Sequence, residues 1–167
     1  MAIIQKKICM VGMFGTGKTS LVQQFVHSKF SEKYHSTVGV KIDRKEVTIA
    51  GTEVHLLLWD LAGQDKFQSV RGTYLRGSSG IFYVADGTRR DTVTALGQLR
   101  GLVRETLGDV PEIIALNKGD LESEWEVTQD DFYRLVDEGQ QVLRTSAKTG
   151  AGVNEAFVWL ASQALKR

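Results

Sequence analysis

Short apolar runs and helical apolar patterns alternate along most of this chain. The runs at 81–85 and 112–116 are hydrophobic on both faces, which is typical of strands buried in a parallel sheet. The run at 7–11 suits a buried strand, and a fourth run is weaker. The four runs lie at residues 7–11 (KICMV), 81–85 (IFYVA), 112–116 (EIIAL) and, for the weaker one, 140–146. Helical spacing of apolar residues predicts helices at 18–26, 92–106, 128–138 and 153–165. Strands joined by helices predict right-handed crossovers and a largely parallel sheet with helices on both faces.

Particular side chains carry the helical spacing. The apolar positions are Leu21, Val22, Phe25 and Val26; Leu96, Leu99 and Val103; Phe132, Leu135 and Val136; and Phe157, Leu160 and Ala164. Thr128 with Asp131 resembles an N-capping pair at the start of the third helix.

The alternation breaks at residues 41–60, where two extended runs flank Ala50-Gly51. This spacing is too short for a crossover helix, so it predicts an antiparallel hairpin that adds one reversed strand at the sheet edge. The fold class is therefore α/β, with a six-stranded, mostly parallel sheet. No repeat or Pro/Ser-rich linker interrupts the chain, and we expect residues 1–167 to form one domain.

Charge and composition exclude several classes of protein. The chain has 21 Lys and Arg against 20 Asp and Glu, which gives no sign of nucleic-acid or polybasic membrane binding. The single cysteine, Cys9, lies in the first apolar run and predicts a small buried residue. No signal peptide, membrane span or lipidation motif is evident. We therefore expect a cytoplasmic monomer without a lipid anchor in this chain.

Residues 12–19 read GMFGTGKT, the G-x-x-x-x-G-K-[ST] pattern of a phosphate-binding loop. Gly12 and Gly17 let backbone N–H groups close around phosphate oxygens, because no Cβ stands in the way. Lys18 would reach the β and γ phosphates, and the Thr19 hydroxyl is a suitable oxygen ligand for Mg²⁺. The loop precedes a helix N-terminus, which also favours anions.

In open α/β sheets, ligands bind beyond the carboxyl ends of the strands. The strand ending at Trp59 is followed by DLAGQ, in which Asp60 is placed for an indirect Mg²⁺ contact. Gly63 can donate its N–H to a γ-phosphate. Gln64 is either a group that orients an attacking water or an ordinary exposed amide.

The strand at 112–116 is followed by NKGD, and the last strand by SAK. A carboxylate at Asp120 can accept from the N1–H and N2–H₂ groups of guanine, for which adenine has no matching pair. Asn117 can brace the loop, and the aliphatic part of Lys118 can lie along the base. The Ala147 N–H can meet the guanine O6.

In order and spacing, GMFGTGKT, STVG, WDLAGQDKF, NKGD and TSAK resemble the guanine-nucleotide motifs of the Ras superfamily of small GTPases. WDLAGQDKF and TYLRG are most similar to the Rab branch or to prokaryotic Ras-like GTPases. The resemblance implies a P-loop NTPase fold, GTP/GDP and Mg²⁺ as ligands, and effector, exchange-factor and GTPase-activating partners.

The resemblance also implies roles for further residues. Thr37 matches the switch threonine that coordinates Mg²⁺ and senses the γ-phosphate, Phe30 packs against guanine, and Tyr34 folds over the phosphates. The implied catalytic residues are Lys18, Thr37, Gly63 and Gln64, and the metal ligands are Thr19, Thr37 and Asp60. The implied nucleotide-binding residues are Gly12, Phe14, Gly15, Thr16, Gly17, Lys18, Thr19, Ser20, Phe30, Tyr34, Thr37, Gly63, Asn117, Lys118, Asp120, Ser146, Ala147 and Lys148.

Phe14 departs from the family pattern, which has glycine or another small residue at this position. A bulky ring here would block an activator's arginine or displace Gln64, unless it turns outward and packs on a neighbouring loop. Loss of an arginine supplied in trans forfeits roughly a thousandfold in rate or more. Phe14 therefore predicts slow turnover or an unconventional activator.

Three functions compete on this sequence. The first is a switch that hydrolyses GTP slowly and reorganises residues 31–41 and 62–76 when the γ-phosphate is lost. An apolar patch of Ile42, Trp59 and Leu75 would then contact an effector, although Trp59 is equally consistent with a core position. The second is a GTP-bound scaffold that scarcely hydrolyses. The third, a P-loop ATP-dependent enzyme, conflicts with NKGD.

Overall fold

The computed structural model describes residues 3–32, 39–61 and 72–166. A six-stranded sheet in the order β2-β3-β1-β4-β5-β6 forms its centre. The strands are β1 (Ile4–Val11), β2 (Val40–Ile49), β3 (Thr52–Leu61), β4 (Gly80–Asp86), β5 (Glu112–Asn117) and β6 (Val142–Arg144). Every neighbouring pair is parallel except β2 with β3. The predicted sheet, with one reversed edge strand, is confirmed.

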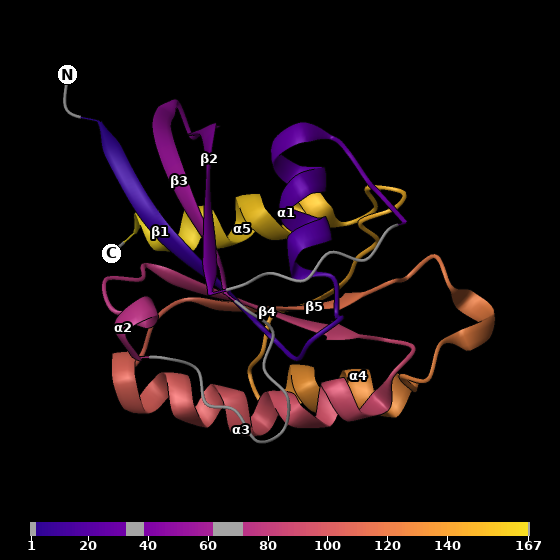
Figure 1. Cartoon of the computed structure of the whole chain (residues 1–167). Coiled ribbons are helices and arrows are strands. Elements are labelled where there is room, and N and C mark those ends of the chain that lie inside the picture. The colour runs from indigo at the N-terminus through magenta and orange to yellow at the C-terminus, as the bar shows by residue number, and fades with distance from the viewer. Residues whose placement is uncertain (1–2, 33–38, 62–71, 167) are drawn as a thin grey trace.

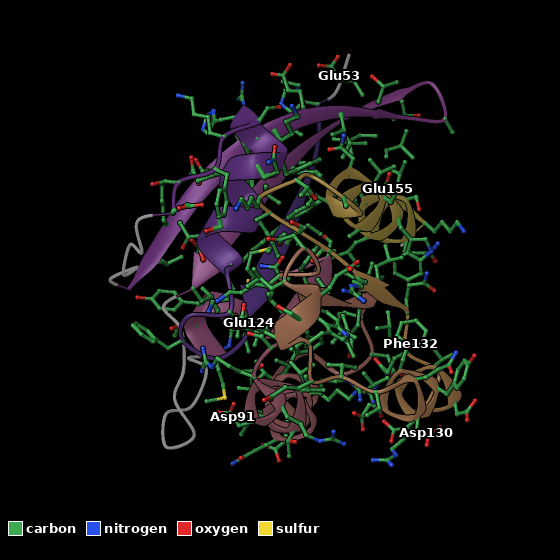
Figure 2. The ribbon with its side chains drawn as sticks, turned by 90° about the vertical axis from the view of Figure 1, so that its right-hand side faces the viewer. Glu53, Asp91, Glu124, Asp130, Phe132 and Glu155 are labelled. Atoms are coloured by element: carbon green, nitrogen blue, oxygen red, sulfur yellow. The ribbon has the colours of Figure 1, made fainter. Side chains whose placement is uncertain are left out.

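Helices cover both faces of this sheet (Figure 1). They are α1 (Lys18–His27), α2 (Gly72–Leu75), α3 (Arg90–Leu107), α4 (Gln129–Asp137) and α5 (Val153–Leu165), with a 3₁₀ helix, η1, at Glu122–Glu124. Helices α1 and α5 lie on one side, and α2, α3 and α4 lie on the other. Figure 2 shows α3, α4 and α5 nearly end-on, with Phe132 of α4 and Glu155 of α5 on opposite sides of the sheet.

Two hydrophobic cores follow from this layering. Phe157 of α5 stacks on Phe25 of α1, with ring centroids 4.2 Å apart, and on Phe82 of β4 at 4.3 Å. The second core contains Leu96, Leu99 and Val103 of α3 against the other face of the sheet. All residues of β4 are buried, as expected for a strand that is hydrophobic on both faces.

The hairpin turn contains only Ala50 and Gly51, because Ile49 pairs directly with Thr52. Both turn residues have positive φ, 49° and 82°. Such a two-residue turn matches the twist of the flanking strands and favours glycine at its second position. The Thr128–Asp131 capping box at the start of α4 is also present, as predicted.

Several expectations about the bounds of strands and helices are wrong. The last strand has three residues rather than seven. The Thr145 N–H still donates to Leu116 of β5, but the Ser146 N–H turns away from the sheet and donates to the Ala151 carbonyl. Strand β3 continues to Leu61 and therefore includes Asp60. The sequence reading also missed the short helices α2 and η1.

The exposed fractions of Leu75 and Val136 contradict the positions predicted for these two side chains. Leu75 is only 1% exposed and packs in the second core, so it cannot join Ile42, which is 50% exposed, in a surface patch. Val136 of α4 is exposed rather than on the buried face.

Trp59 is half-buried opposite Ile42 in the hairpin, and the Lys7 Nζ lies 3.5 Å from its ring centroid. Cys9 is fully buried, as expected.

Candidate nucleotide site

The phosphate loop runs from the end of β1 to the start of α1 and owes its shape to glycine. A Cβ on Gly12 would lie 2.3 Å from the carbonyl oxygen of Val84, so the loop passes directly over β4. Gly15 and Gly17 have φ of 78° and 103°, a region that other residues rarely adopt. A Cβ on Gly17 would also lie 2.2 Å from Asn117 Nδ2. The three glycines are therefore required by this backbone path.

The Lys18 side chain curls back over this loop. Its Nζ donates to the carbonyls of Gly12 and Met13 at 3.0 and 3.1 Å. Burial lowers the pKa of Lys18 to about 8, and the negative charge of Asp60 partly opposes that shift. A buried ammonium with neutral partners is costly, and an anion bound in the loop would offset this cost.

Thr19 at the start of α1 and Asp60 on β3 meet beside this lysine. The Thr19 hydroxyl donates to Asp60 Oδ2 at 2.5 Å. They come together because β1 and β3 are neighbours and Met10 pairs in register with Asp60. A hydroxyl and a carboxylate are the hard oxygen ligands that Mg²⁺ prefers, so these residues fit a magnesium site.

Asn117, at the end of β5, joins the phosphate loop to the next two loops. Its Nδ2 donates to the Thr16 carbonyl at 3.0 Å. Its Oδ1 accepts from the Thr145 hydroxyl at 3.1 Å and from the Ala147 N–H at 3.3 Å. Asn117 is only 2% exposed, so all three bonds lie out of water. One side chain, at the start of NKGD, therefore ties the phosphate loop to the loop at residues 145–147.

The remaining residues of NKGD are also held. The Ser146 hydroxyl donates to Asp120 Oδ1 at 2.7 Å. Lys118 adopts a φ of 66°, and its Nζ lies 2.9 Å from Asp86 Oδ2. A carboxylate offers about four acceptor positions, so Asp120 keeps capacity for further donors.

Other predicted nucleotide-binding residues border this region. Lys148 Nζ pairs with Glu32 Oε1 at 3.3 Å, which ties the SAK loop to the segment after α1. Phe30, in that same segment, is exposed. Ser20 lies half-buried in the first turn of α1. Tyr34, Thr37, Gly63 and Gln64 lie outside the described residues.

Two residues near the site escaped the sequence reading. Arg89, directly before α3, donates through Nη1 to the Phe14 carbonyl at 3.2 Å. The sequence signal that could have found Arg89 is its position three residues after the end of β4. Gln24 of α1 donates through Nε2 to the Ala147 carbonyl at 2.7 Å. The Phe14 side chain itself is 50% exposed.

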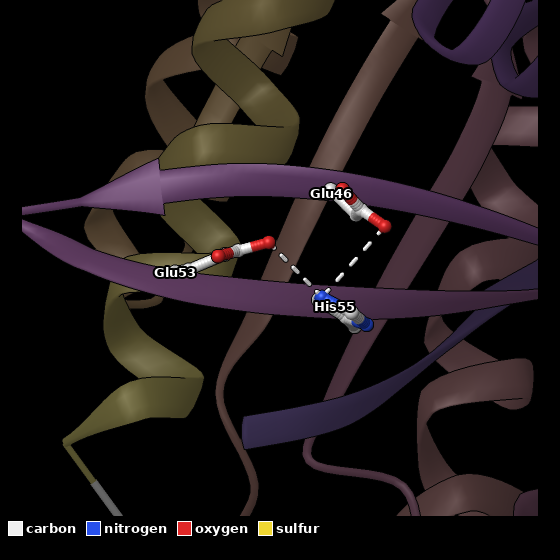
Figure 3. A group of neighbouring side chains, drawn as sticks. All are labelled: Glu46, Glu53 and His55. Atoms are coloured by element: carbon white, nitrogen blue, oxygen red, sulfur yellow. Dashed lines mark hydrogen bonds and ion pairs between the residues drawn. The ribbon is translucent and has the colours of Figure 1, made fainter. Parts of the chain in front are cut away.

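A further titratable cluster lies on the hairpin. Glu46 pairs in register with His55, and Glu53 is two residues before His55, so all three share a sheet face. His55 Nε2 lies 3.2 Å from Glu53 Oε1 and 3.8 Å from Glu46 Oε1 (Figure 3). These groups are close enough to hold a metal ion.

Two observations argue against a metal there. Arg44 Nη2 already pairs with Glu46 Oε1 at 3.1 Å. A metal-binding histidine normally donates its other ring N–H to an acceptor, whereas the buried His55 Nδ1 has no partner among the described residues. We therefore describe Glu46, Glu53, His55 and Arg44 as a side-chain cluster held by the Arg44–Glu46 ion pair and the contacts of His55 with the two carboxylates.

Comparison with known proteins decides the family. The family model described as "Ras family" matches residues 7–166. The chain belongs to the Ras family. This small GTPase is 37% identical over 163 residues to the human Ras-related protein Rab-4A, covering 96% of this chain and 75% of that protein. It is 38% identical over 165 residues to the human Ras-related protein Rab-4B, covering 96% and 76%.

Family membership gives the basic activity. The protein is a Rab-like, GTP-binding molecular switch with GTPase activity. Its six-stranded sheet has the expected P-loop GTPase fold. These findings weigh against the ATP-dependent enzyme. Among the described residues, no helix is both long enough and apolar enough to cross a membrane.

Proposed function

We propose that residues 1–167 act as one G domain that binds GTP or GDP, together with Mg²⁺, across the loops described above. The observation that carries this proposal is the Asn117 side chain, which bonds to Thr16 in the phosphate loop and to Thr145 and Ala147 beside the base loop. A single buried amide thus couples the two ends of the proposed nucleotide site.

The proposed roles follow from the chemistry of each group. The loop at 12–19 holds the phosphates through backbone N–H groups and Lys18. Asp120 accepts from guanine N1–H and N2–H₂, and the Ala147 N–H meets O6. Lys118 and Phe30 pack against the base. Ser20, Tyr34, Ser146 and Lys148 complete the nucleotide contacts.

Thr19, Thr37 and Asp60 are the residues that would hold the metal. Mg²⁺ in this position would neutralise charge on the phosphate oxygens. The adjacent oxygens of Thr19 and Asp60 support this assignment.

Hydrolysis in this proposal requires Gln64 to orient a water molecule in line with the γ-phosphate. The water oxygen forms the new bond to phosphorus, the bond to the β–γ bridging oxygen breaks, and the water proton passes to the released phosphate. Lys18 stabilises the charge on the phosphate oxygens, and Thr37 and Gly63 contact the γ-phosphate. Loss of that group releases residues 31–41 and 62–76, and effectors distinguish the two states.

Base specificity gives the direct test. Nucleotide extracted from the purified protein should be guanine nucleotide, and GDP should outcompete ADP. Asp120→Asn replaces an acceptor with an amide, so the variant should lose its guanine preference and favour xanthine, whose C2 carbonyl accepts a hydrogen bond. Asp130→Asn, an exposed change at the start of α4, is the matched control. Adenine nucleotide in the purified protein, or an unchanged preference in Asp120→Asn, would overturn the proposal.

The half-exposed Phe14 favours a second candidate, a GTP-bound scaffold with very slow hydrolysis. Single-turnover hydrolysis of GTP separates the two. If the protein turns over through Gln64, Gln64→Ala should be slower than the wild type, and Phe14→Gly should be at least as fast. Equal, near-zero rates for the wild type and Gln64→Ala would favour the scaffold. Exchange factors, activating proteins and a monomeric state remain part of the first proposal.

A further inference from the structure

An arginine–tryptophan stack lies beside the NKGD loop. Trp125 follows η1, is half-buried and packs against the second core. Arg144 is the last residue of β6, and its Cζ lies 3.9 Å from the centroid of the Trp125 ring. A guanidinium over the face of tryptophan is a favourable cation–π contact, and it also restricts the long arginine side chain.

Arg144 holds the third residue of NKGD from one side. Its Nη2 donates to the Gly119 carbonyl at 2.7 Å. The N–H of Gly119 donates to the Thr145 carbonyl at 2.8 Å, so both backbone polar groups of Gly119 are bonded to the same segment. A Cβ on Gly119 would lie 2.9 Å from Arg144 Cγ, which shows how closely the arginine covers the loop.

Trp125 is fixed in turn by the end of β4. A Cβ on Gly87 would lie 2.1 Å from the Trp125 ring, so the ring rests directly on this glycine. The N–H of Glu126, the next residue, donates to the Gly87 carbonyl at 2.8 Å. Beside Gly87, Asp86 holds the Lys118 ammonium at 2.9 Å. The NKGD loop is thus braced through β4 as well as through β6.

Such bracing has a conformational reason. Lys118 has a φ of 66°, a left-handed conformation that costs energy in any residue with a Cβ. This strain persists only where the surroundings determine the backbone strongly. The contacts to Gly119 lie between this strained residue and Asp120, the proposed guanine acceptor.

We propose that the Trp125–Arg144 stack is a positioning element for guanine recognition. It keeps the Asp120 carboxylate aligned with the base and so sets how long guanine nucleotide stays bound. This inference rests on the proposed function, because it assumes that Asp120 reads the base. Neither residue belongs to a motif that the sequence reading used.

The experiment compares dissociation of two nucleotides from the whole chain. GDP and inosine diphosphate differ only in the 2-amino group, which is one of the two groups that would donate a hydrogen bond to Asp120. Labelled nucleotide is chased with excess unlabelled GDP in the presence of Mg²⁺. The variants are Arg144→Ala, Trp125→Leu and the double variant. Arg104→Ala on α3, an exposed arginine paired with Glu112, is the control.

Arg144→Ala and Trp125→Leu should each release GDP about threefold to tenfold faster, as expected for losing one charge-assisted hydrogen bond or one stacked contact. Because inosine diphosphate has one donor fewer to lose, the ratio of its release rate to that of GDP should fall. The double variant should resemble the single ones, since both remove the same brace. Trp125→Phe, which keeps an aromatic face, should stay within about twofold of the wild type.

Thermal unfolding of each variant separates positioning from general stability. A lower melting temperature with an unchanged ratio of the two release rates would make the stack merely structural and overturn the inference. Unchanged GDP release from Arg144→Ala, whose side chain is exposed and not needed for the core, would overturn it as well. If the wild type does not prefer GDP to ADP, the proposed function fails and the inference falls with it. If the wild type prefers GDP to ADP but both single variants release GDP at the wild-type rate, the inference is wrong and the proposed function is unaffected.

Discussion

Asn117→Ala tests whether the Asn117 side chain stabilises the site by linking the phosphate loop to the loop at residues 145–147. The substitution removes the three hydrogen bonds to Thr16, Thr145 and Ala147. Each bond contributes about 1 kcal/mol net, and a buried partner left unsatisfied costs about 1–3 kcal/mol. Because Asn117 is 2% exposed, water cannot easily replace the amide. We expect the free energy of unfolding to fall by about 3–5 kcal/mol.

Thr145→Val provides the matched control for this prediction. It keeps the side-chain shape and removes only the bond from the Thr145 hydroxyl to Asn117 Oδ1. The expected loss is about 1 kcal/mol. Both variants are unfolded in urea without nucleotide and again with excess GDP, followed by circular dichroism. A loss below about 1 kcal/mol for Asn117→Ala without nucleotide, or an equal loss for Thr145→Val, would refute the assignment of three stabilising bonds.

Three further predictions concern single residues. Burial lowers the pKa of Lys18 from 10.5 to about 8, so between these values the unfolded chain binds the extra proton and the stability of nucleotide-free protein should rise with pH. Lys18→Met should flatten this rise in urea unfolding at pH 8 and pH 10, and an identical slope would contradict it. Gly12→Ala should destabilise by more than about 3 kcal/mol because its Cβ meets the Val84 carbonyl oxygen, whereas Gly51→Ala, with positive φ in open space, should cost only about 1–2 kcal/mol. Thr128→Ala removes the α4 capping box and should cost about 1 kcal/mol in thermal or chemical unfolding, and no measurable loss would show that the cap is dispensable.

Local patterns were enough to predict most of the fold. Strands β4 and β5 read as apolar runs because both of their faces are covered, and α5 was predicted with its observed bounds of Val153–Leu165. The spacing around Ala50-Gly51 predicted the hairpin, since a two-residue turn leaves no room for a crossover. Periodicity is a property of neighbouring residues, so the sequence carries it directly.

The short strand β6 and the helix α2 depended on tertiary contacts instead. Strand β6 ends at Arg144, where the Thr145 and Ser146 side chains donate to Asn117 and Asp120 of NKGD. The Thr145 N–H still donates to Leu116 of β5. Leu75 is buried because α2 packs on the second core, although the sequence reading placed it on the surface. Such outcomes depend on residues distant along the chain, which no local pattern represents.

For the candidate site, the sequence by itself determined the residue types and their order: the glycines, Lys18, Thr19, Asn117 and Asp120. Only the tertiary structure decided how they meet. The parallel register brings Asp60 beside Thr19, and Asn117 bonds to Thr16 in a loop 101 residues earlier in the sequence. The contacts of Arg144 with Trp125 and Gly119 also belong to no motif, because contacts between distant segments follow from packing of the whole sheet.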